Sequence, residues 1–344
     1  MIELARELFS DAEAWVVGGA VRDQLLGREL VDLDIALRDP EPASRKYARR
    51  SGGAPFPLSE RHGAWRVALE LGRTVDFTPL PRTIEDDLAT RDFTINAMAQ
   101  PVAGGELVDP FGGAADLETG RLRAVGPSVF KDDPLRLLRA VRLEDELGFR
   151  LDASTEELVR SDADLVERPA GERILAELMR LSAGGYRRLE ELGLLAPLGG
   201  GLDERLDRVD TPEYRLVAVF GEELRRYPVS NELRRYAQKL LHAEAPADDG
   251  PRAIHRFRRA TEPWALDALE FVGASELRDA VLAARADESD TPLLRGDELG
   301  LPPGPEIGRL LDEVAEERAA GTITTKEQAL EYVRRNAGAV RSDR

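Results

Sequence analysis

Two aspartates, Asp32 and Asp34, stand two residues apart in a run where polar and apolar residues alternate. In an extended strand, residues i and i+2 point to the same face, so the two carboxylates would lie side by side. Their repulsion is unfavourable unless a cation or a basic partner offsets it, and a divalent metal is the usual reason for such a pair. Asp76, in the apolar run 75–77, could add a third carboxylate from a neighbouring strand. Alone the spacing is a weak signal, because exposed strand faces also carry two aspartates by chance.

Two glycines, Gly18 and Gly19, separate a short apolar run from a helical segment that contains Arg22. The N–H groups of such a turn and the positive end of the following helix can hold a triphosphate, and Arg22 lies in reach of the same anion. The alternative is a tight strand-to-helix turn with a surface arginine. A phosphate-binding turn followed by metal-binding carboxylates is typical of a polymerase palm, where two Mg²⁺ ions activate a 3′-hydroxyl and neutralise the leaving pyrophosphate.

A third polar group, Asp133-Pro134-Leu135-Arg136, opens a long helical segment. One interpretation is helix capping, with Asp133 as the N-cap and Pro134 at the first helical position. The other is base recognition, because positions 133 and 136 share one face of a helix. A carboxylate acceptor beside a guanidinium donor matches the Watson–Crick edges of cytosine and adenine, whereas guanine and uracil present mismatched edges. Both interpretations can hold at once.

The secondary structure expected to position these residues differs between the first third of the chain and the rest. Up to about residue 111 the pattern predicts a mixed α/β module. Its strands are expected at 14–17, 31–37, 64–71 and 74–80, and its helices at 20–26 and 43–50. From residue 116 the pattern is mostly helical, clearest at 134–147 and 172–181, and Gly148 and Gly184 are expected as helix stops. Proline and glycine clusters predict further breaks at 197–201, 245–251 and 301–305, and a last pair of helices, 306–335, split at Gly321.

Composition limits the class of protein. A chain of 344 residues with 42% hydrophobic and 33% charged residues is expected to fold into two to four globular modules. No apolar run reaches the roughly 18 residues that a membrane span needs, and the lack of cysteine excludes disulfides and thiolate chemistry. These features predict a cytoplasmic protein. The net charge of -17 argues against a general nucleic-acid binder, although a local basic stripe, for example at 45–50 or 252–259, can coexist with it.

Six motifs together resemble those of class II tRNA nucleotidyltransferases, the family of CCA-adding enzymes and bacterial poly(A) polymerases. They occur in the order of that family and span roughly residues 15 to 335. The motifs are Val17-Gly-Gly-Ala-Val-Arg-Asp23 with Asp32-Leu-Asp34, Arg91-Asp-Phe-Thr-Ile-Asn-Ala97, Asp109-Pro-Phe-Gly-Gly113, Asp132-Asp-Pro-Leu-Arg136 continuing to Arg142, Glu172-Arg-Ile174, and Gly304-Pro-Glu-Ile-Gly308.

The resemblance implies template-independent addition of CC or CCA to the 3′ end of tRNA. CTP and ATP are the implied substrates, Mg²⁺ the cofactor, and the acceptor–TΨC arm the part of tRNA that is gripped; no membrane is implied and no protein partner is indicated. The implied fold is a polymerase-β-like α/β palm, or head, followed by an all-helical neck, body and tail. Their expected bounds are 1–115, 116–185, 186–285 and 286–344.

The resemblance also assigns roles to residues. The expected catalytic residues are Asp32, Asp34 and Asp76, and the first two are expected to hold the metal. Asp92 is expected to contact the ribose hydroxyl, with Asn96 organising its loop, whereas Arg173 is expected only to support the neck. The nucleotide-binding residues are expected to be Gly18, Gly19, Arg22, Asp92, Asn96, Asp133, Arg136 and Arg139.

The chain departs from the family pattern in three places. Thr90 stands where an arginine is usual, and Asp132 where a glutamate is usual. Only eight residues, 77–84, separate Asp76 from Glu85; members that add A have a longer, flexible loop here, and a short one resembles the CC-adding subtype. Two alternatives stay open. A poly(A) polymerase would usually carry a strongly basic extension, and the intact carboxylates argue against a catalytically idle RNA-binding protein.

Overall fold

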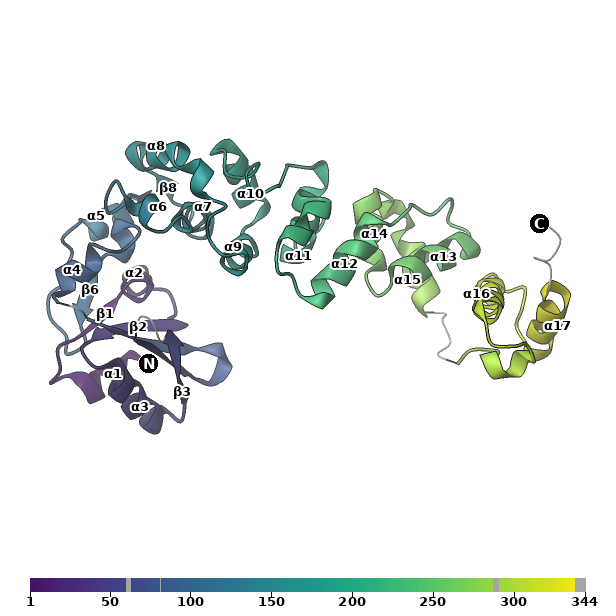
Figure 1. Cartoon of the computed structure of the whole chain (residues 1–344), viewed down its shortest axis with the longest axis horizontal. Helices are drawn as coiled ribbons and strands as arrows, with labels where there is room; N and C mark the ends of the chain where they lie inside the picture. The colour runs from purple at the N-terminus through teal and green to yellow at the C-terminus, as the bar shows by residue number, and fades with distance from the viewer. Residues whose placement is uncertain (60–62, 81, 287–290, 338–344) are drawn as a thin grey trace. The chain divides into compact units, whose positions relative to one another are not determined.

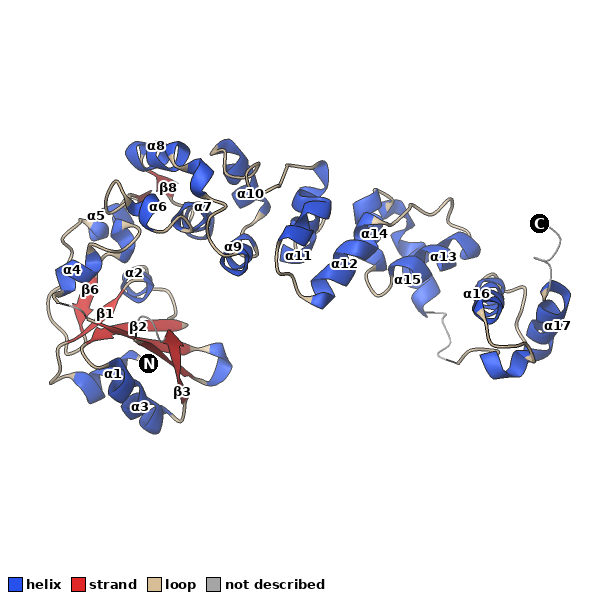
Figure 2. Ribbon diagram, viewed as in Figure 1, coloured by secondary structure: helices blue, strands red, loops and turns tan. Residues whose placement is uncertain are grey.

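The computed structural model describes residues 1–59, 63–80, 82–286 and 291–337, and these form two compact units, Met1–Gly201 and Leu202–Arg344. The strands lie in the first unit, and the second consists of helices and their connections (Figures 1 and 2). The break between the units follows the proline and glycine cluster at 197–201. The division into head, neck, body and tail stays a prediction.

The first unit contains a six-stranded mixed sheet in the order β3-β4-β5-β2-β1-β6. Its strands are β1 (Ala14–Val17), β2 (Asp32–Leu37), β3 (Ala54–Ser59), β4 (Ala64–Ala68), β5 (Thr74–Pro79) and β6 (Ala99–Pro101). The four predicted strands are confirmed, with β4 ending earlier than expected. The two unpredicted strands, β3 and β6, are the sheet edges and contain proline. Proline has no backbone N–H to donate to a neighbouring strand, so it is tolerated at a sheet edge. Because proline within a run argues against a strand, the sequence pattern did not predict these two.

Two helices, α1 (Ile2–Phe9) and α3 (Pro40–Ser51), cover one face of this sheet, and α2 (Gly19–Leu25) lies on the other side (Figure 1). Phe77 of β5 is fully buried on the covered face, with its ring centroid 5.9 Å from that of Phe9 and 5.7 Å from that of Tyr47. Residues alternate between faces along a strand, so burying Phe77 and its neighbours turns Asp76 to the opposite face. The same alternation turns Asp32 and Asp34 away from α1 and α3.

The rest of the first unit is mostly helical, as predicted. Its helices are α4 (Ile84–Leu88), α5 (Gly113–Glu118), α6 (Val129–Asp132), α7 (Arg136–Leu147), α8 (Ala153–Ser161), α9 (Gly171–Leu178) and α10 (Ala183–Glu191). The expectation of an all-helical neck was wrong in one detail. A parallel pair of two-residue strands, β7 (Arg121–Leu122) and β8 (Arg150–Leu151), lies in this region, and strands this short are below the length at which alternation can be recognised.

The two glycines expected as helix stops behave differently. Gly148 follows α7 with φ of 69°, the left-handed conformation that ends many helices. The prediction for Gly184 was wrong, since Gly184 lies in the first turn of α10. There the Ser182 hydroxyl caps the helix by accepting hydrogen bonds from the N–H groups of Gly184 (3.1 Å) and Gly185 (3.3 Å).

The second unit is built from α-helices joined by turns and short 3₁₀ helices. The α-helices are α11 (Pro212–Phe220), α12 (Asn231–Leu241), α13 (Pro251–Thr261), α14 (Ala265–Val272), α15 (Arg278–Ala286), α16 (Pro305–Ala319) and α17 (Lys326–Asn336). The predicted break at Gly321 between the last two is confirmed. Short 3₁₀ turns in the chain are Glu70–Gly72, Thr94–Asn96, Ala163–Leu165, Glu204–Asp207, Gly221–Arg226, Ser275–Leu277 and Gly296–Leu299. Across the described residues, no helix is both long enough and apolar enough to cross a membrane.

The arginine cluster at 252–259, a candidate basic stripe, lies on α13 and is bound by acids of α16. Arg252 forms a two-pronged ion pair with Glu317 (2.8 and 2.9 Å), and Arg256 forms one with Glu316. Arg259 also forms an ion pair with Asp312, from Nη2 to Oδ1. These arginines therefore join two helices of the unit, and the cluster's charge is largely balanced where it lies.

Candidate active site

Strand register brings the three aspartates to one face of the sheet. β2 and β5 are parallel, with Asp34 directly beside Asp76. Asp32 accepts a hydrogen bond from the Thr74 hydroxyl (2.7 Å). Asp32 and Asp34 both line a cavity of about 630 Å³, whereas Asp76 is not among its lining residues. Asp76 is instead bound through both carboxylate oxygens by Arg66 of β4 (2.7 and 2.8 Å).

The carboxylate of Asp34 lies in surroundings that disfavour its charged form. Its pKa is raised to about 6, first by burial and then by the charges of Asp76 and Asp32, while Arg91 and Arg66 oppose the shift. Both arginines bind other aspartates, Arg91 pairing with Asp87 (2.6 Å) and Arg66 with Asp76. A cation between Asp32 and Asp34 would relieve this charge, and carboxylate oxygens are the ligands that Mg²⁺ prefers. The donor set therefore fits a divalent metal.

Two carboxylates are the extent of this cluster. No group of three or more Asp, Glu, His or Cys side chains is arranged to hold a metal ion in the part of the chain that the structure describes. The third aspartate of the face, Asp76, is the one that Arg66 binds. The remaining ligands of a metal here would come from water or substrate, as is common for Mg²⁺ in phosphoryl-transfer sites.

The glycine turn lies directly against the carboxylates. Gly18 has φ of 68°, and a Cβ placed on it would lie 3.4 Å from Asp34 Oδ2 and 3.3 Å from Arg91 Nη1. A side chain at this position would be strained and would fill the space beside Asp34. Gly19 and Arg22, which follow in α2, line the cavity. The backbone of Gly18 therefore lies close to the carboxylate of Asp34, and the backbone of Gly19 lies at the cavity wall.

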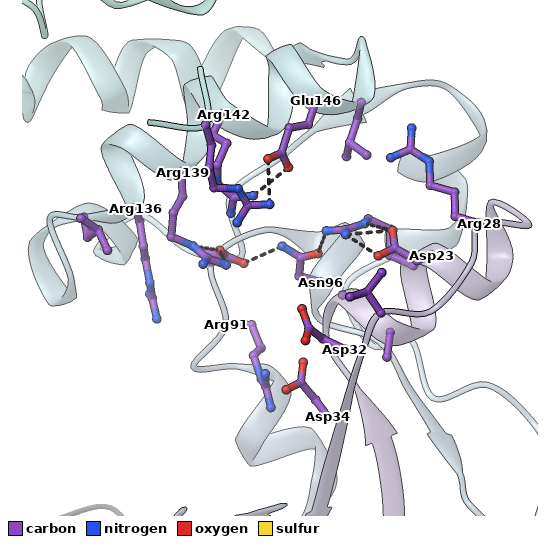
Figure 3. Close-up of a pocket in the computed structure, with 18 of the residues that line it drawn as sticks. Asp23, Arg28, Asp32, Asp34, Arg91, Asn96, Arg136, Arg139, Arg142 and Glu146 are labelled. Carbon is purple, nitrogen blue, oxygen red and sulfur yellow. Dashed lines mark hydrogen bonds and ion pairs between the residues drawn. The ribbon is translucent and has the colours of Figure 1, made fainter. Parts of the chain in front are cut away.

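A hydrogen-bonded chain runs from Arg22 into the buried part of the site (Figure 3). Arg22 donates from Nη1 to Asn96 Oδ1 (2.8 Å), and Asn96 donates from Nδ2 to Asp92 Oδ1 (3.0 Å). Asp92, which is 5% exposed, also pairs with Arg139 of α7 (2.6 Å). Burial alone raises the pKa of Asp92, but the charge of Arg139 and the hydrogen bonds from Asn96, Arg139 and the Phe93 N–H outweigh it and hold the pKa below its ordinary value. Asp92 is therefore an ionised, fixed acceptor.

The predicted base-reading pair lies in the same cavity, but each member already has a partner. Asp133 binds Arg173 (2.9 Å) and accepts a hydrogen bond from the Leu135 N–H (3.2 Å). Arg136 donates to the backbone carbonyl of Thr90 (2.6 Å). The bond to Leu135 is a local contact between side chain and backbone. The capping interpretation was wrong in its positions, because α7 begins at Arg136 with Leu135, not Asp133, as its N-cap. The side chains stay at the cavity, where both line the wall.

Sequence reasoning missed several charged residues of this cavity. They are Arg28, Arg91, Arg142, Glu146, Arg173 and Arg180. Arg142 could have been found, because positions 136, 139 and 142 recur every three residues on α7 and so share a face; Figure 3 shows these three arginines gathered at one side of the pocket. Arg173, expected only to support the neck, lies against Asp133 from α9. Its partner is 40 residues away, and no local pattern predicts such a pair.

Most of the predicted residues meet in one place. The cavity wall includes Gly19, Arg22, Asp32, Asp34, Asp92, Asn96, Asp133, Arg136 and Arg139. Gly18 is not a lining residue, but it lies next to Asp34, which is one. Asp76 is not a lining residue either, and it is paired with Arg66. Eight arginines and seven acids line the wall, so the cavity has a slight excess of positive charge in a chain whose net charge is -17. Such a wall suits a polyanionic substrate with a cation at one end.

Comparison with known proteins agrees with this arrangement. Residues 14–80 and 60–123 match the family described as the poly A polymerase head domain. An A-adding tRNA nucleotidyltransferase of Deinococcus radiodurans is 35% identical over 94% of this chain and 95% of its own length. A CC-adding tRNA nucleotidyltransferase of Geobacter sulfurreducens is 33% identical over 93% and 91%, and one of Thermus thermophilus 32% identical over 94% of each.

Solved structures share the fold. The CCA-adding enzyme of Thermotoga maritima, solved with tRNA, is 24% identical and superimposes with a TM-score of 0.73 over 97% of this chain and 94% of its own. A CCA-adding enzyme solved with CTP gives a TM-score of 0.79 at 24% identity over the same shares. The predicted fold class, a polymerase-β-like head followed by a mostly helical remainder, is confirmed.

Proposed function

This chain belongs to the class II tRNA nucleotidyltransferase family, and from that premise we propose that it adds two cytidines to the 3′ end of tRNA in the cavity described above. The observation that carries the proposal is that one cavity is lined both by the paired carboxylates Asp32 and Asp34 and by the pair Asp133 and Arg136. The first pair suits phosphoryl transfer, and the second suits selection of a base without a nucleic-acid template. The grip on the acceptor–TΨC arm of tRNA is assigned to the helical remainder of the chain.

Nucleotidyltransferases generally use divalent metal ions, and Asp32 and Asp34 are the residues that would hold one here. When bound, Mg²⁺ supplies activation of the attacking 3′-hydroxyl and neutralisation of the leaving pyrophosphate, with two ions in the usual arrangement. The raised pKa of Asp34 supports this assignment, because it reports a carboxylate in need of a positive partner.

Residues of the chain would hold the rest of the nucleotide in reach of these carboxylates. Gly18 and Gly19 leave the triphosphate room to approach the backbone. Arg22 lines the cavity beside them, and its guanidinium is held by Asp23 (2.9 Å from both Nε and Nη2) and by Asn96 (2.8 Å), so it would have to share its donors with a phosphate. Asp92 would accept a hydrogen bond from the ribose. Asn96 and Arg139 support that role by holding Asp92 ionised and in one orientation.

Base selection would require an exchange of partners. Asp133 would leave Arg173 to accept from the N4 amino group of cytosine, and Arg136 would leave the Thr90 carbonyl to donate to N3 and O2. Uracil presents an acceptor where Asp133 needs a donor. Binding the wrong base would therefore break two existing interactions without replacing both, which favours CTP over UTP.

The connection after β5 supports addition of C alone. β5 ends at Pro79 and α4 begins at Ile84, which leaves only four connecting residues, of which Pro81 lies outside the described residues. Leu80 is 6% exposed and packs in the same core cluster as Ile84. A short connection anchored at both ends has little freedom to reshape the site between C and A addition.

The test is a matrix of primers and nucleotides. tRNA ending at the discriminator base and tRNA ending in CC are each offered CTP alone, ATP alone, or both, with Mg²⁺. We expect two cytidines on the first tRNA and no adenosine on the second. Adenosine addition to the CC end would contradict the CC assignment, and failure to extend either tRNA would contradict the proposed function.

A further inference from the structure

Three charged side chains lie in a row across the sheet. In strand register, Asp34 on β2 is beside Asp76 on β5, and Asp76 is opposite Arg66 on β4. Neighbouring strands are about 4.8 Å apart, so Asp76 stands one strand away from Asp34 and one strand away from Arg66. The middle carboxylate therefore has two possible partners, a cation held beside Asp34 or the guanidinium of Arg66.

In the structure, Asp76 is bound by Arg66. Its Nε donates to Asp76 Oδ1 at 2.7 Å and its Nη2 to Oδ2 at 2.8 Å, so both carboxylate oxygens are engaged. The two side chains are 34% and 14% exposed, so solvent weakens this pair less than it would weaken one on an open surface. Two parallel N–H···O bonds from a planar fork are also the strongest form of such a contact.

The other two aspartates of the face are arranged differently. Asp32 and Asp34 line the cavity, and Asp32 accepts its hydrogen bond from a neutral hydroxyl, that of Thr74. Asp76 and Arg66 are not lining residues of that cavity. This separation also accounts for the finding that no three acidic, histidine or cysteine side chains of the described residues are arranged around a common metal position.

We propose that Arg66 is a positioning residue that withholds Asp76 from the metal site, so that a divalent cation is held by Asp32 and Asp34 alone. The proposal rests on the metal assignment made above and adds to it a residue that sets the number of protein ligands. Its consequence is specific. Removal of the Arg66 fork frees a third carboxylate beside Asp34, and the affinity for a divalent cation rises.

The test is a Mn²⁺ titration of the full chain, without nucleotide or RNA, followed by electron paramagnetic resonance of the free ion. Four proteins are compared with the wild type: Arg66→Gln, Asp76→Asn, the double variant, and Arg38→Gln. Arg38 follows the other end of β2 and pairs with Glu13, so its variant controls for loss of one arginine from the same module. Metal affinities respond to neighbouring groups by about 10- to 100-fold, and we expect Arg66→Gln to tighten binding about 10-fold.

The double-mutant cycle separates the proposal from a simple effect of charge. If Arg66 acts by withholding Asp76, Arg66→Gln has no effect in the Asp76→Asn background, and Asp76→Asn alone changes affinity less than about 3-fold. The proposal is overturned by an equal effect in both backgrounds, which would indicate repulsion through space. It is also overturned if Arg66→Gln fails to tighten binding, or if Asp76→Asn alone weakens binding 10-fold.

Two further variants keep the outcome interpretable. Arg66→Lys retains the charge but cannot form the two-pronged contact, so it is expected to tighten Mn²⁺ binding as well, and it replaces Arg66→Gln if that variant does not fold. Asp34→Asn tests the underlying metal site. If its Mn²⁺ affinity equals that of the wild type, the metal assignment has failed, whereas failure of the Arg66 variants alone leaves that assignment intact.

Discussion

The two ends of the cavity use the same kinds of side chain in opposite ways. At the sheet end, the arginines that act on Asp34 bind other acids, and its pKa is raised to about 6. At the helix end, Asp133 is paired with Arg173 and Arg136 with the Thr90 carbonyl. One end thus presents unbalanced negative charge, whereas the other is internally satisfied.

This difference indicates what each end requires from its ligand. At the sheet end, the proposed cation would favour the charged form of Asp34, which burial and the neighbouring carboxylates disfavour. If the helix end reads the base as proposed, it must exchange its bonds, so only a base that replaces both of them would bind without a penalty. The hydrogen-bonded chain Arg22–Asn96–Asp92–Arg139 also belongs to this cavity, and in the proposed function it would help to hold the nucleotide.

The largest expected effect is at the sheet end. Substitution Asp32→Ala or Asp34→Ala removes a proposed ligand for the cation, and we expect CTP incorporation to fall on the order of 10³-fold, as for loss of an electrostatic group that acts on the transition state. Affinity for tRNA should stay within about 2-fold, because the RNA-binding surface is assigned elsewhere. Single-turnover extension and filter binding measure the two quantities. Retained turnover in both variants would contradict the proposal that Asp32 and Asp34 hold the metal.

The next effect concerns the link between the ends. Asp92→Asn removes the charged partner of the half-buried Arg139, and we expect a loss of about 2 kcal/mol in the free energy of unfolding of the first unit. The pKa of Asp92 is lower in the folded chain than in the unfolded one, so its contribution is present above about pH 4 and is lost as the pH falls through the folded value. Urea unfolding at pH 7 and pH 3 measures both. Glu13→Gln, at an exposed ion pair, is the control and should change stability by less than about 1 kcal/mol.

A smaller effect is expected at the helix end. Asp133→Asn exchanges an acceptor for an amide that can also donate, and the preference for CTP over UTP should fall about 10-fold, within the 1–3 kcal/mol typical of a base-reading contact. The ratio of kcat/KM for the two nucleotides measures it. Glu29→Gln, an exposed position in the same cavity wall, should leave this ratio unchanged. An equal loss in both variants would show that discrimination does not depend on Asp133.

The smallest effect has the opposite sign. The folded pKa of Asp34 is raised, so its ionised form destabilises the metal-free protein, and stability declines as the pH rises from about 4 to about 6. In the presence of a chelator at pH 7, Asp34→Asn should therefore be more stable than the wild type, by less than the roughly 3 kcal/mol to which the raised pKa corresponds. Thermal unfolding at pH 4 and pH 7 measures the difference, which should shrink at the lower pH. A destabilised variant at pH 7 would contradict the view that this end lacks positive charge.

Local spacing was enough to predict the parts of this site that lie close together in sequence. The i, i+2 aspartates of β2 and the Gly18 turn follow from periodicity and backbone conformation. Pairs between distant residues were not predictable in this way. Arg66 reaches Asp76 through strand register, Arg173 reaches Asp133 across 40 residues, and Arg136 binds a backbone carbonyl, which no side-chain pattern records.

The most direct test is a crystal structure of the full chain with CTP and Mn²⁺. The account predicts the metal between Asp32 and Asp34, the triphosphate along the turn that precedes Arg22, and cytosine on Asp133 and Arg136. In that complex the contacts of Asp133 with Arg173 and of Arg136 with the Thr90 carbonyl are broken. A complex in which both contacts persist and the base lies elsewhere would contradict it.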